Sequence, residues 1–169
     1  MSIKSVLSRW ARGFDPDKYF SCREKFYKTK SSFMKMYYKY KVLKMERSAA
    51  YIGLRDNVEN KDIFENRPVL LHGIQGLFIS AEARIGKNAK IMQNVTIGKS
   101  KGVAPVIGDN VFIGANACII GGIKIGNNVR IGAGAVVAKD VPDNTTVVAQ
   151  PCRYIQKSGD YHYVVEIED

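Results

Sequence analysis

The sequence predicts an all-β solenoid, in which the chain winds into stacked coils of short strands. From Ile79 to Pro142 an aliphatic residue returns every six residues, with one interruption. Four residues later the side chain is again small or aliphatic in nine of the ten repeats, and the residue after the first is glycine in six. Such internal repetition decides the fold class before any single residue does. The repeated positions are Ile79, Ile85, Ile91, Ile97, Ile107, Ile113, Ile119, Ile125, Ile131 and Val137.

A period of six is not that of a helix, whose apolar residues recur at about 3.6. It is a multiple of the strand period of two, so the same side chain returns to the inside each time. β-branched residues pack well on a pleated surface, and the glycine is expected to ease a tight corner. Because one coil cannot bury its own face, the coils must stack. An ordinary β-sandwich would require this spacing to be a coincidence.

The repeat slips once, because ten residues separate Ile97 from Ile107. The hexads resume afterwards, so residues 99–105 are expected to leave the coil as an external loop. Insertions in repeat proteins form loops on one face, which is often the binding face. A surface insertion without a role is the alternative.

Residues 1–50 are predicted to form a basic helical extension. Residues 1–47 contain thirteen Lys or Arg and four Asp or Glu, and therefore carry nearly all of the net charge of +10. Asp15 followed by Pro16 is typical of a helix start, and Ser32 is expected to cap a further helix. The first interpretation is a helical cap that packs on the solenoid. Because the segment is also rich in Tyr and Phe, contact with an anionic membrane surface is the alternative, ahead of contact with nucleic acid.

The predicted organisation is a helical extension over residues 1–50, a β-helix domain over 51–156 and a C-terminal tail over 157–169. A closing strand is expected from Thr145 to Ala149. No apolar stretch is long enough to span a membrane, and the first residues lack a secretory leader. Three cysteines without metal spacing fit a reducing compartment. We therefore expect a cytoplasmic protein, with peripheral membrane contact as an option, and no metal.

His72 is the candidate for chemistry, since the chain has one other histidine, His162, in the tail. His72 stands where the coil begins, and Gly73 and Gly76 beside it leave room for a ligand. Histidine is the usual general base near neutral pH. A structural role is the alternative for a lone histidine.

The hexads, the external loop and the His-Gly-x-x-Gly segment at His72 resemble the left-handed β-helix acyltransferases. Within that family the chain looks like the serine acetyltransferase branch, which includes enzymes that O-acetylate capsular and exopolysaccharide sugars. The resemblance covers about residues 52–156 and implies a left-handed, parallel β-helix. It also implies that His72 takes the proton of an acceptor hydroxyl. An upstream acid orients the imidazole in that branch, and Asp56 matches it best, with Glu59 and Asp62 as alternatives.

The same resemblance implies acetyl-CoA as acetyl donor, bound in the groove between neighbouring subunits of a homotrimer. By position, Ala115 lines the pantetheine arm, and Ala133 and Lys139 match later contacts to coenzyme A. Pro151-Cys152-Arg153 matches a terminal motif of the wider family, which adds Arg153 to the cofactor-binding set. Lys99 and Lys101 on the loop are candidates to meet its phosphates as point charges.

Two departures bear on the acceptor. Serine acetyltransferases carry aspartate just before the base, where this chain has Leu71. They also carry an Arg-His pair that holds the serine carboxylate, where this chain has Val103 and Ala104. We therefore expect an acetyl-CoA-dependent O-acetyltransferase acting on a sugar hydroxyl of a polysaccharide. Serine O-acetyltransferase is the alternative enzyme, and a non-catalytic β-helix scaffold is the alternative outside enzymes.

Overall fold

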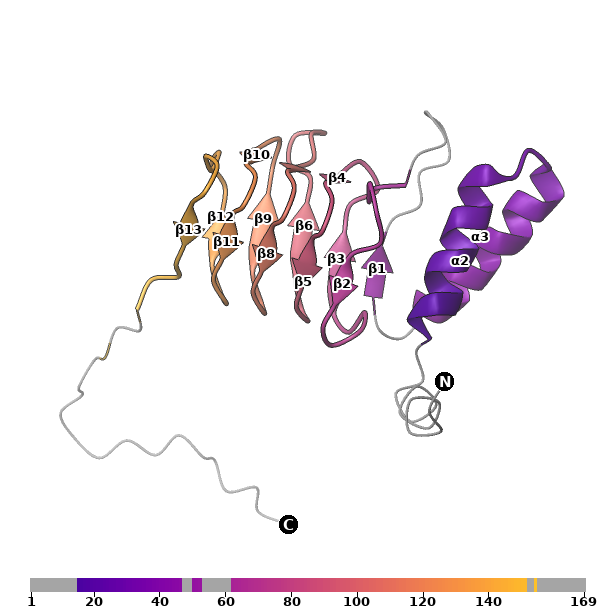
Figure 1. Cartoon of the computed structure of the whole chain (residues 1–169), viewed down its shortest axis with the longest axis horizontal. Helices are drawn as coiled ribbons and strands as arrows, with labels where there is room; N and C mark the ends of the chain where they lie inside the picture. Colours follow the sequence, from indigo (N-terminus) through magenta and orange to yellow (C-terminus); the bar gives the residue numbers. More distant parts are fainter. Residues whose placement is uncertain (1–14, 47–49, 53–61, 152–153, 155–169) are drawn as a thin grey trace, which may run out of the picture.

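The computed structural model describes residues 15–46, 50–52, 62–151 and 154. Within them the chain forms a prism of stacked coils, with a pair of helices at its N-terminal end (Figure 1). The helices are α2 (Pro16–Lys28) and α3 (Ser32–Glu46). Asp15 caps α2 as expected, because its Oδ1 accepts hydrogen bonds from the backbone N–H of Asp17 and Lys18. For α3 the cap was expected at Ser32 but is Ser31, whose Oγ accepts from Met34 at 3.4 Å.

Three parallel sheets form the faces of the prism, and each coil adds one short strand to each complete face. Sheet A contains β1 (Ala50–Ile52), β3 (Leu77–Ile79), β6 (Thr96–Gly98), β9 (Cys118–Ile120) and β12 (Val136–Val137). Sheet B contains β4 (Arg84–Ile85), β7 (Val106–Ile107) and β10 (Lys124–Ile125). Sheet C contains β2 (Val69–Leu70), β5 (Lys90–Ile91), β8 (Phe112–Ile113), β11 (Arg130–Ile131) and β13 (Thr146–Val147). The predicted closing strand is therefore present as β13, in shorter form.

The isoleucine columns are inside, as the period predicts. Ile79 pairs with Ile97, which pairs with Ile119 on the following coil, and Ile91 pairs with Ile113 in the same way on sheet C. All ten repeated aliphatics are buried, and so are the nine small or aliphatic residues four positions later. Burying an aliphatic side chain stabilises a fold by about 1.5–3 kcal/mol. The stacked columns are therefore the main apolar core of the solenoid.

Four of the six repeat glycines, Gly86, Gly108, Gly114 and Gly126, are required for a different reason from the expected tight corner. At Gly108 and Gly126 the backbone φ is not positive, but a Cβ would lie 2.9 and 2.8 Å from a carbonyl carbon of the next coil. These glycines therefore allow the coils to approach one another closely, rather than allowing the chain to turn. The left-handed conformation at the corners belongs mainly to asparagine, at Asn88, Asn94, Asn110, Asn116, Asn128 and Asn144.

Asparagine also links the coils along one edge of the prism, between sheets B and C. The side-chain amide of Asn88 donates to Asn110 at 3.0 Å, and that of Asn110 donates to Asn128 at 3.2 Å. The same contact continues to Asn144 at 3.1 Å. This asparagine ladder combines a side chain that tolerates the left-handed region with an amide that can both donate and accept.

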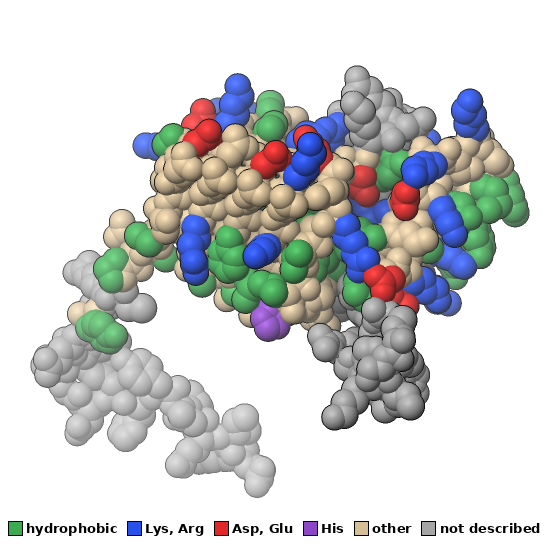
Figure 2. Space-filling model, in the orientation of Figure 1, with side chains coloured by type: hydrophobic (Ala, Val, Ile, Leu, Met, Phe, Trp, Pro, Cys, Tyr) green, Lys and Arg blue, Asp and Glu red, His purple; other side chains and the backbone are tan. Residues whose placement is uncertain are grey.

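A buried polar network fixes the helical pair on the first coil. Arg23 is fully buried and donates to the carboxylate of Asp62 and to the carbonyl oxygen of Ile52 at 2.9 Å. Tyr19 donates to Glu46 at 2.6 Å and accepts from Arg23 at 3.1 Å. Burial raises the pKa of Glu46, while its bonds to Tyr19 and the charge of Arg23 oppose that shift. Apolar and basic side chains both gather on the outside of this helical end (Figure 2).

The asparagine ladder can be tested at Asn110, whose φ is 57°. Glycine would remove the side-chain hydrogen bonds but accept this conformation, whereas alanine would lose the bonds and also hold a strained backbone. We expect both variants to unfold more easily. Asn110→Ala should lose about 1 kcal/mol more than Asn110→Gly, after allowance for the freedom of unfolded glycine. Equilibrium urea denaturation measures the difference, and equal losses would contradict a role for the left-handed conformation.

Candidate active site

His72 lies on an enlarged corner between sheets C and A. Eight residue steps separate Leu70 from Phe78, against five between their strand partners Ile91 and Thr96. Gly73 and Gly76 have φ values of 72° and 63°, which the six-residue turn requires. A Cβ on Gly76 would lie 2.0 Å from the Asn94 side chain, so another residue there would have to displace that side chain and hold a strained backbone. The corner thus presents His72 as an exposed side chain at the surface of the prism.

The register of the coils aligns three residues along the edge on which His72 lies. Ile91 pairs with Ile113, and Ile113 with Ile131. The second residue after each of these is Gln93, Ala115 and Ala133, and these three form one line along the edge between sheets C and A. Backbone hydrogen bonds tie this line together, such as Gly134 N–H to the Ala115 carbonyl oxygen at 2.8 Å. On the first coil the Asn94 N–H binds the Gln75 carbonyl oxygen at 3.0 Å, so Gln75 continues the line and His72 stands three residues earlier on the same enlarged corner. We call this edge of the prism, from the His72 corner to Ala133, the His72 edge.

Gln93 is a residue of the His72 edge that sequence reasoning missed. Its Oε1 is buried and has no hydrogen-bond partner among the residues that the structure describes. Nearly all buried polar atoms in proteins are paired, so an unpaired acceptor needs an explanation. A ligand that donates a hydrogen bond at this edge would supply one. The signal in the sequence was the repeat itself, since Gln93 follows Ile91 as Ala115 follows Ile113.

The acid that orients His72 is not assigned by the described contacts. Asp62 is half-buried and binds Arg23, and its Oδ1 also accepts from the Ile63 N–H at 2.7 Å. Among the residues described, no hydrogen bond joins His72 to an acid. Asp56 and Glu59 lie outside the described residues, so Asp56 remains a prediction.

The predicted lysines lie on the other edge of sheet A, where it meets sheet B. Ser100 and Val103 pair across a tight turn, with both backbone bonds at 3.0 Å, so the loop is a small hairpin. Its two central residues, Lys101 and Gly102, have φ values of 50° and 80°. Such a turn suits a two-residue hairpin. The residues inserted between the hexads thus form a small hairpin on this edge of the prism, which we call the loop edge.

Lys99 is engaged at the base of the hairpin. Its Nζ donates to Glu82 at 3.0 Å, and Ser80 donates to the other oxygen of Glu82 at 2.6 Å. These bonds lower the pKa of Glu82 to about 2. Lys101 and Lys139 are exposed on the same edge, and Lys139 lies two coils beyond Lys99 by the register of sheet A.

The predicted cofactor-binding set thus divides between two edges of one subunit. His72, Ala115 and Ala133 share the His72 edge, whereas Lys99, Lys101 and Lys139 share the loop edge. Sheet A separates the two edges. The chain takes about six residues to cross this sheet, which is roughly 20 Å at about 3.3 Å per residue along a strand. Arg153 lies outside the described residues. One subunit therefore does not bring the lysines next to His72.

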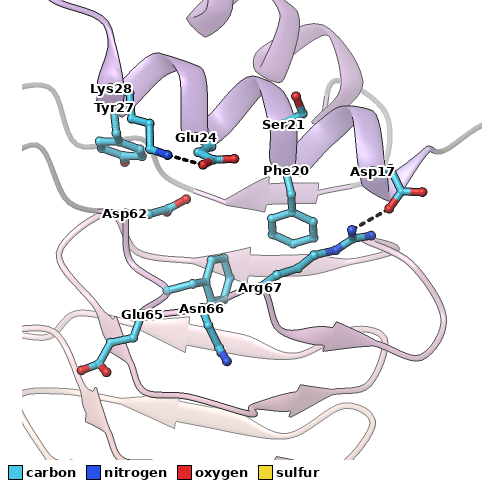
Figure 3. A pocket seen from close by; sticks show the side chains of 11 residues that line it. Asp17, Phe20, Ser21, Glu24, Tyr27, Lys28, Asp62, Glu65, Asn66 and Arg67 are labelled. Carbon is cyan, nitrogen blue, oxygen red and sulfur yellow. Dashed lines mark hydrogen bonds and ion pairs between the residues drawn. The ribbon is translucent and has the colours of Figure 1, made fainter.

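Two further features of the described residues bear on binding. A groove of about 520 Å³ lies between α2 and the first coil, lined by both acids and bases (Figure 3). Asp17 pairs there with Arg67 and Glu24 with Lys28, each at 2.5 Å. The groove shares no residue with the His72 edge. In the part of the chain that the structure describes, no three His, Cys, Asp or Glu side chains gather as they would around a metal ion.

Comparison with known proteins agrees with this architecture. Residues 104–139 match the family described as bacterial transferase hexapeptide (six repeats). Comparison with curated proteins finds no match. The predicted left-handed parallel β-helix of hexapeptide repeats with an N-terminal helical extension is therefore confirmed.

Solved structures of serine acetyltransferases are similar to this chain. The enzyme of Neisseria gonorrhoeae in complex with serine is 34% identical, with a TM-score of 0.54 over 72% of this chain and 48% of that one. Isoform 3 of Entamoeba histolytica in complex with cysteine is 26% identical, with a TM-score of 0.57 over 76% and 45%. The soybean apoenzyme is 27% identical, with a TM-score of 0.59 over 82% and 55%.

This chain spans about half the length of these structures. The resemblance to hexapeptide-repeat acyltransferases of the serine acetyltransferase-like branch is confirmed.

The orphan acceptor of Gln93 makes a prediction about stability. Replacing an unpaired buried polar group by an apolar one of similar shape is nearly neutral or stabilising. We therefore expect Gln93→Leu to leave the midpoint of thermal unfolding unchanged or to raise it. A loss above about 1 kcal/mol would show that Oε1 has a donor within the folded protein, and would remove the argument for a ligand.

Proposed function

We propose that this protein is an acetyl-CoA-dependent O-acetyltransferase that acts on a hydroxyl group of a sugar. The observation that carries the proposal is the position of exposed His72 on the corner that begins the edge carrying Gln93, Ala115 and Ala133. Small side chains in register leave a strip on which an extended thioester arm can lie against the backbone. The similarity to serine acetyltransferases supports acetyl transfer as the reaction class.

In the proposed reaction His72 accepts the proton of the acceptor hydroxyl. The hydroxyl oxygen attacks the thioester carbonyl carbon, the carbon–sulfur bond breaks, and the departing thiolate takes the proton back from His72. Backbone N–H groups near this edge would stabilise the oxyanion, as preorganised donors do in acyl transfer. Asp56 is proposed to hold the imidazole in the tautomer that leaves the other nitrogen free.

Gln93 is proposed to accept a hydrogen bond from an N–H or O–H of a bound substrate. Its buried Oε1 accepts no hydrogen bond from the described residues, so a substrate donor would be paired without displacing one of their contacts. A donor or acceptor left unpaired in a buried site costs about 1–3 kcal/mol, so Gln93→Leu should lower the rate of transfer by roughly tenfold or more.

The choice of a sugar over serine is supported by the loop. Val103, at one position of the expected Arg-His pair, packs over Gly122, where a Cβ would lie 2.5 Å from its Cγ1. Ala104, at the other position, is buried and apolar. Neither residue can pair with a carboxylate, which serine acetylation needs. Serine O-acetylation remains the alternative enzyme function, because the similar solved structures carry that name.

A homotrimer is proposed as the working assembly. The exposed side chains of sheet A include Phe78 and Val136, which are 49% and 73% exposed, with Ile120 at 37%. By the register of sheet A, Phe78 and Val136 share an outward column with Thr96 and Cys118, so this column carries no charged side chain. An exposed surface with several large apolar residues often marks a contact with another subunit. Packing of this face on another subunit would bring the loop edge of one copy to the His72 edge of the next. Peripheral contact of the basic N-terminal segment with a membrane would further bring the enzyme to lipid-linked acceptors.

The acceptor is tested by measuring thiol release from acetyl-CoA with a panel of sugars and with L-serine. We expect turnover with a sugar, and a loss of about 10²–10⁴-fold in His72→Ala with an unchanged melting temperature. His162→Ala is the matched control and should keep full activity. Turnover of L-serine with a Michaelis constant in the micromolar to low-millimolar range would favour the alternative enzyme. If acetyl-CoA at millimolar concentration failed to raise the melting temperature, a non-catalytic scaffold would be favoured.

The assembly is tested by Val136→Glu, which places a charge within the proposed interface on sheet A. We expect light scattering to show a trimer for the original protein and smaller species for the variant, since burying an unpaired charge is costly. Thr146→Glu on sheet C is the control and should leave the mass unchanged. A monomeric original protein that is fully active would refute the shared site.

A further inference from the structure

Helix α3 exposes an apolar surface that the fold does not use. Val42 and Glu46 on its inner side are buried against the rest of the protein, as the helical pair packs. On the opposite side, five large apolar residues follow one another at helical spacing and are between 41% and 71% exposed. We call them the α3 outer face: Phe33, Met36, Tyr37, Tyr40 and Leu43.

The charges on α3 are of one sign. Lys41 and Lys44 lie on the α3 outer face or beside it, and Lys39 lies at its other border on a helical wheel. The only acid of this helix, Glu46, is buried and bonded to Tyr19. Lys41 lies over the ring of Tyr37, with its Nζ 4.7 Å from the ring centre. The exposed surface of α3 is thus apolar and basic, without an acid.

Helix α2 is different, although it belongs to the same helical pair. Its exposed residues carry both signs, and Glu24 pairs with Lys28 one turn away. That pattern is usual for a helix whose outer side faces water. The apolar and basic surface is therefore a property of α3, and Figure 2 shows hydrophobic side chains gathered at this outer end of the molecule.

We propose that the α3 outer face docks on the surface of an anionic lipid bilayer. A helix that exposes aromatic and aliphatic side chains together with lysines can lie on such an interface, with its lysines toward the lipid headgroups. Long lysine side chains can cover apolar surface while their charged ends reach the lipid phosphates. Among the described residues no helix is long and apolar enough to span a membrane, so the contact is peripheral.

A second copy of this chain fits the face less well. Two such faces in contact would oppose lysine to lysine without an exposed acid on α3 to pair with them. The basic balance of residues 1–47, thirteen Lys or Arg against four Asp or Glu, favours an anionic occupant. Charge complementarity therefore selects the lipid surface.

Docking through α3 would also place the first coils of the prism nearest to the membrane. Helix α3 contacts β1, and β1 pairs with β3, which directly follows the His72 corner. This consequence rests on the proposed function, because it matters only if His72 acts on an acceptor. The docking itself does not depend on catalysis and can be measured without substrates.

The test is co-sedimentation of the full chain with vesicles, without acetyl-CoA or acceptor. We expect binding to phosphatidylcholine vesicles that contain phosphatidylglycerol, weak binding to phosphatidylcholine alone, and release at high salt. The double variant Phe33→Glu with Tyr40→Glu should weaken binding by about tenfold or more, since it removes apolar contact and adds repulsion. Both residues are more than half exposed, so folding should be retained, which circular dichroism checks.

The matched control is Val148→Glu with Tyr154→Glu, which adds the same charge at the far end of the prism. These side chains are 76% and 93% exposed, and this variant should bind vesicles like the original protein. Equal binding by all three proteins, or no binding by the original protein, would overturn the proposal. It would also be overturned if the α3 variant instead reduced the oligomer mass in the absence of lipid, because a second copy would then be the occupant.

Discussion

The close stacking of coils in register is the constraint on which this structure depends. Parallel strands of neighbouring coils lie about 4.8 Å apart, so each coil must have the same cross-section as the next. Isoleucine fills the inside because identical side chains stack without gaps. Glycine stands where two coils would otherwise collide, as at Gly108 and Gly126. Asparagine occupies the left-handed corners and links one coil to the next through its side chain.

The same constraint builds the candidate site. His72 is separated from Ala133 by sixty-one residues in sequence, yet stacking places both on one edge of the prism. The edge offers one imidazole, one unpaired amide oxygen and two small side chains, while the lysines stand across sheet A. A binding groove that uses both edges needs more than one copy. Assembly and catalysis are therefore linked in the proposed function through the geometry of a single face.

Much of the fold could be predicted because the period acts on every coil. The hexads predicted which residues point inward, and the slip after Ile97 predicted a segment that leaves the coil. Asp15 followed by Pro16 predicted the start of α2. The reason for the glycines could not be predicted, since it lies in contact between coils and not in local backbone conformation. Arg23 and its partners were also missed, because Asp62 is thirty-nine residues away and no periodicity connects them. Gln93 was missed because its unpaired oxygen is a property of packing, whereas the roles of Asp56 and Arg153 stay predictions.

The regular spacing of the coils has a consequence for how such a chain can change in length. Beyond the hairpin, stacked partners such as Phe112 and Arg130 lie eighteen residues apart. Gain or loss of eighteen residues would add or remove one complete coil. The contacts between the remaining coils would stay the same. A single-residue insertion within a strand would instead turn its inward side chains to the outside. Proteins of this architecture should therefore differ in length by whole coils. Other insertions should be confined to corners such as those that carry His72 and the hairpin.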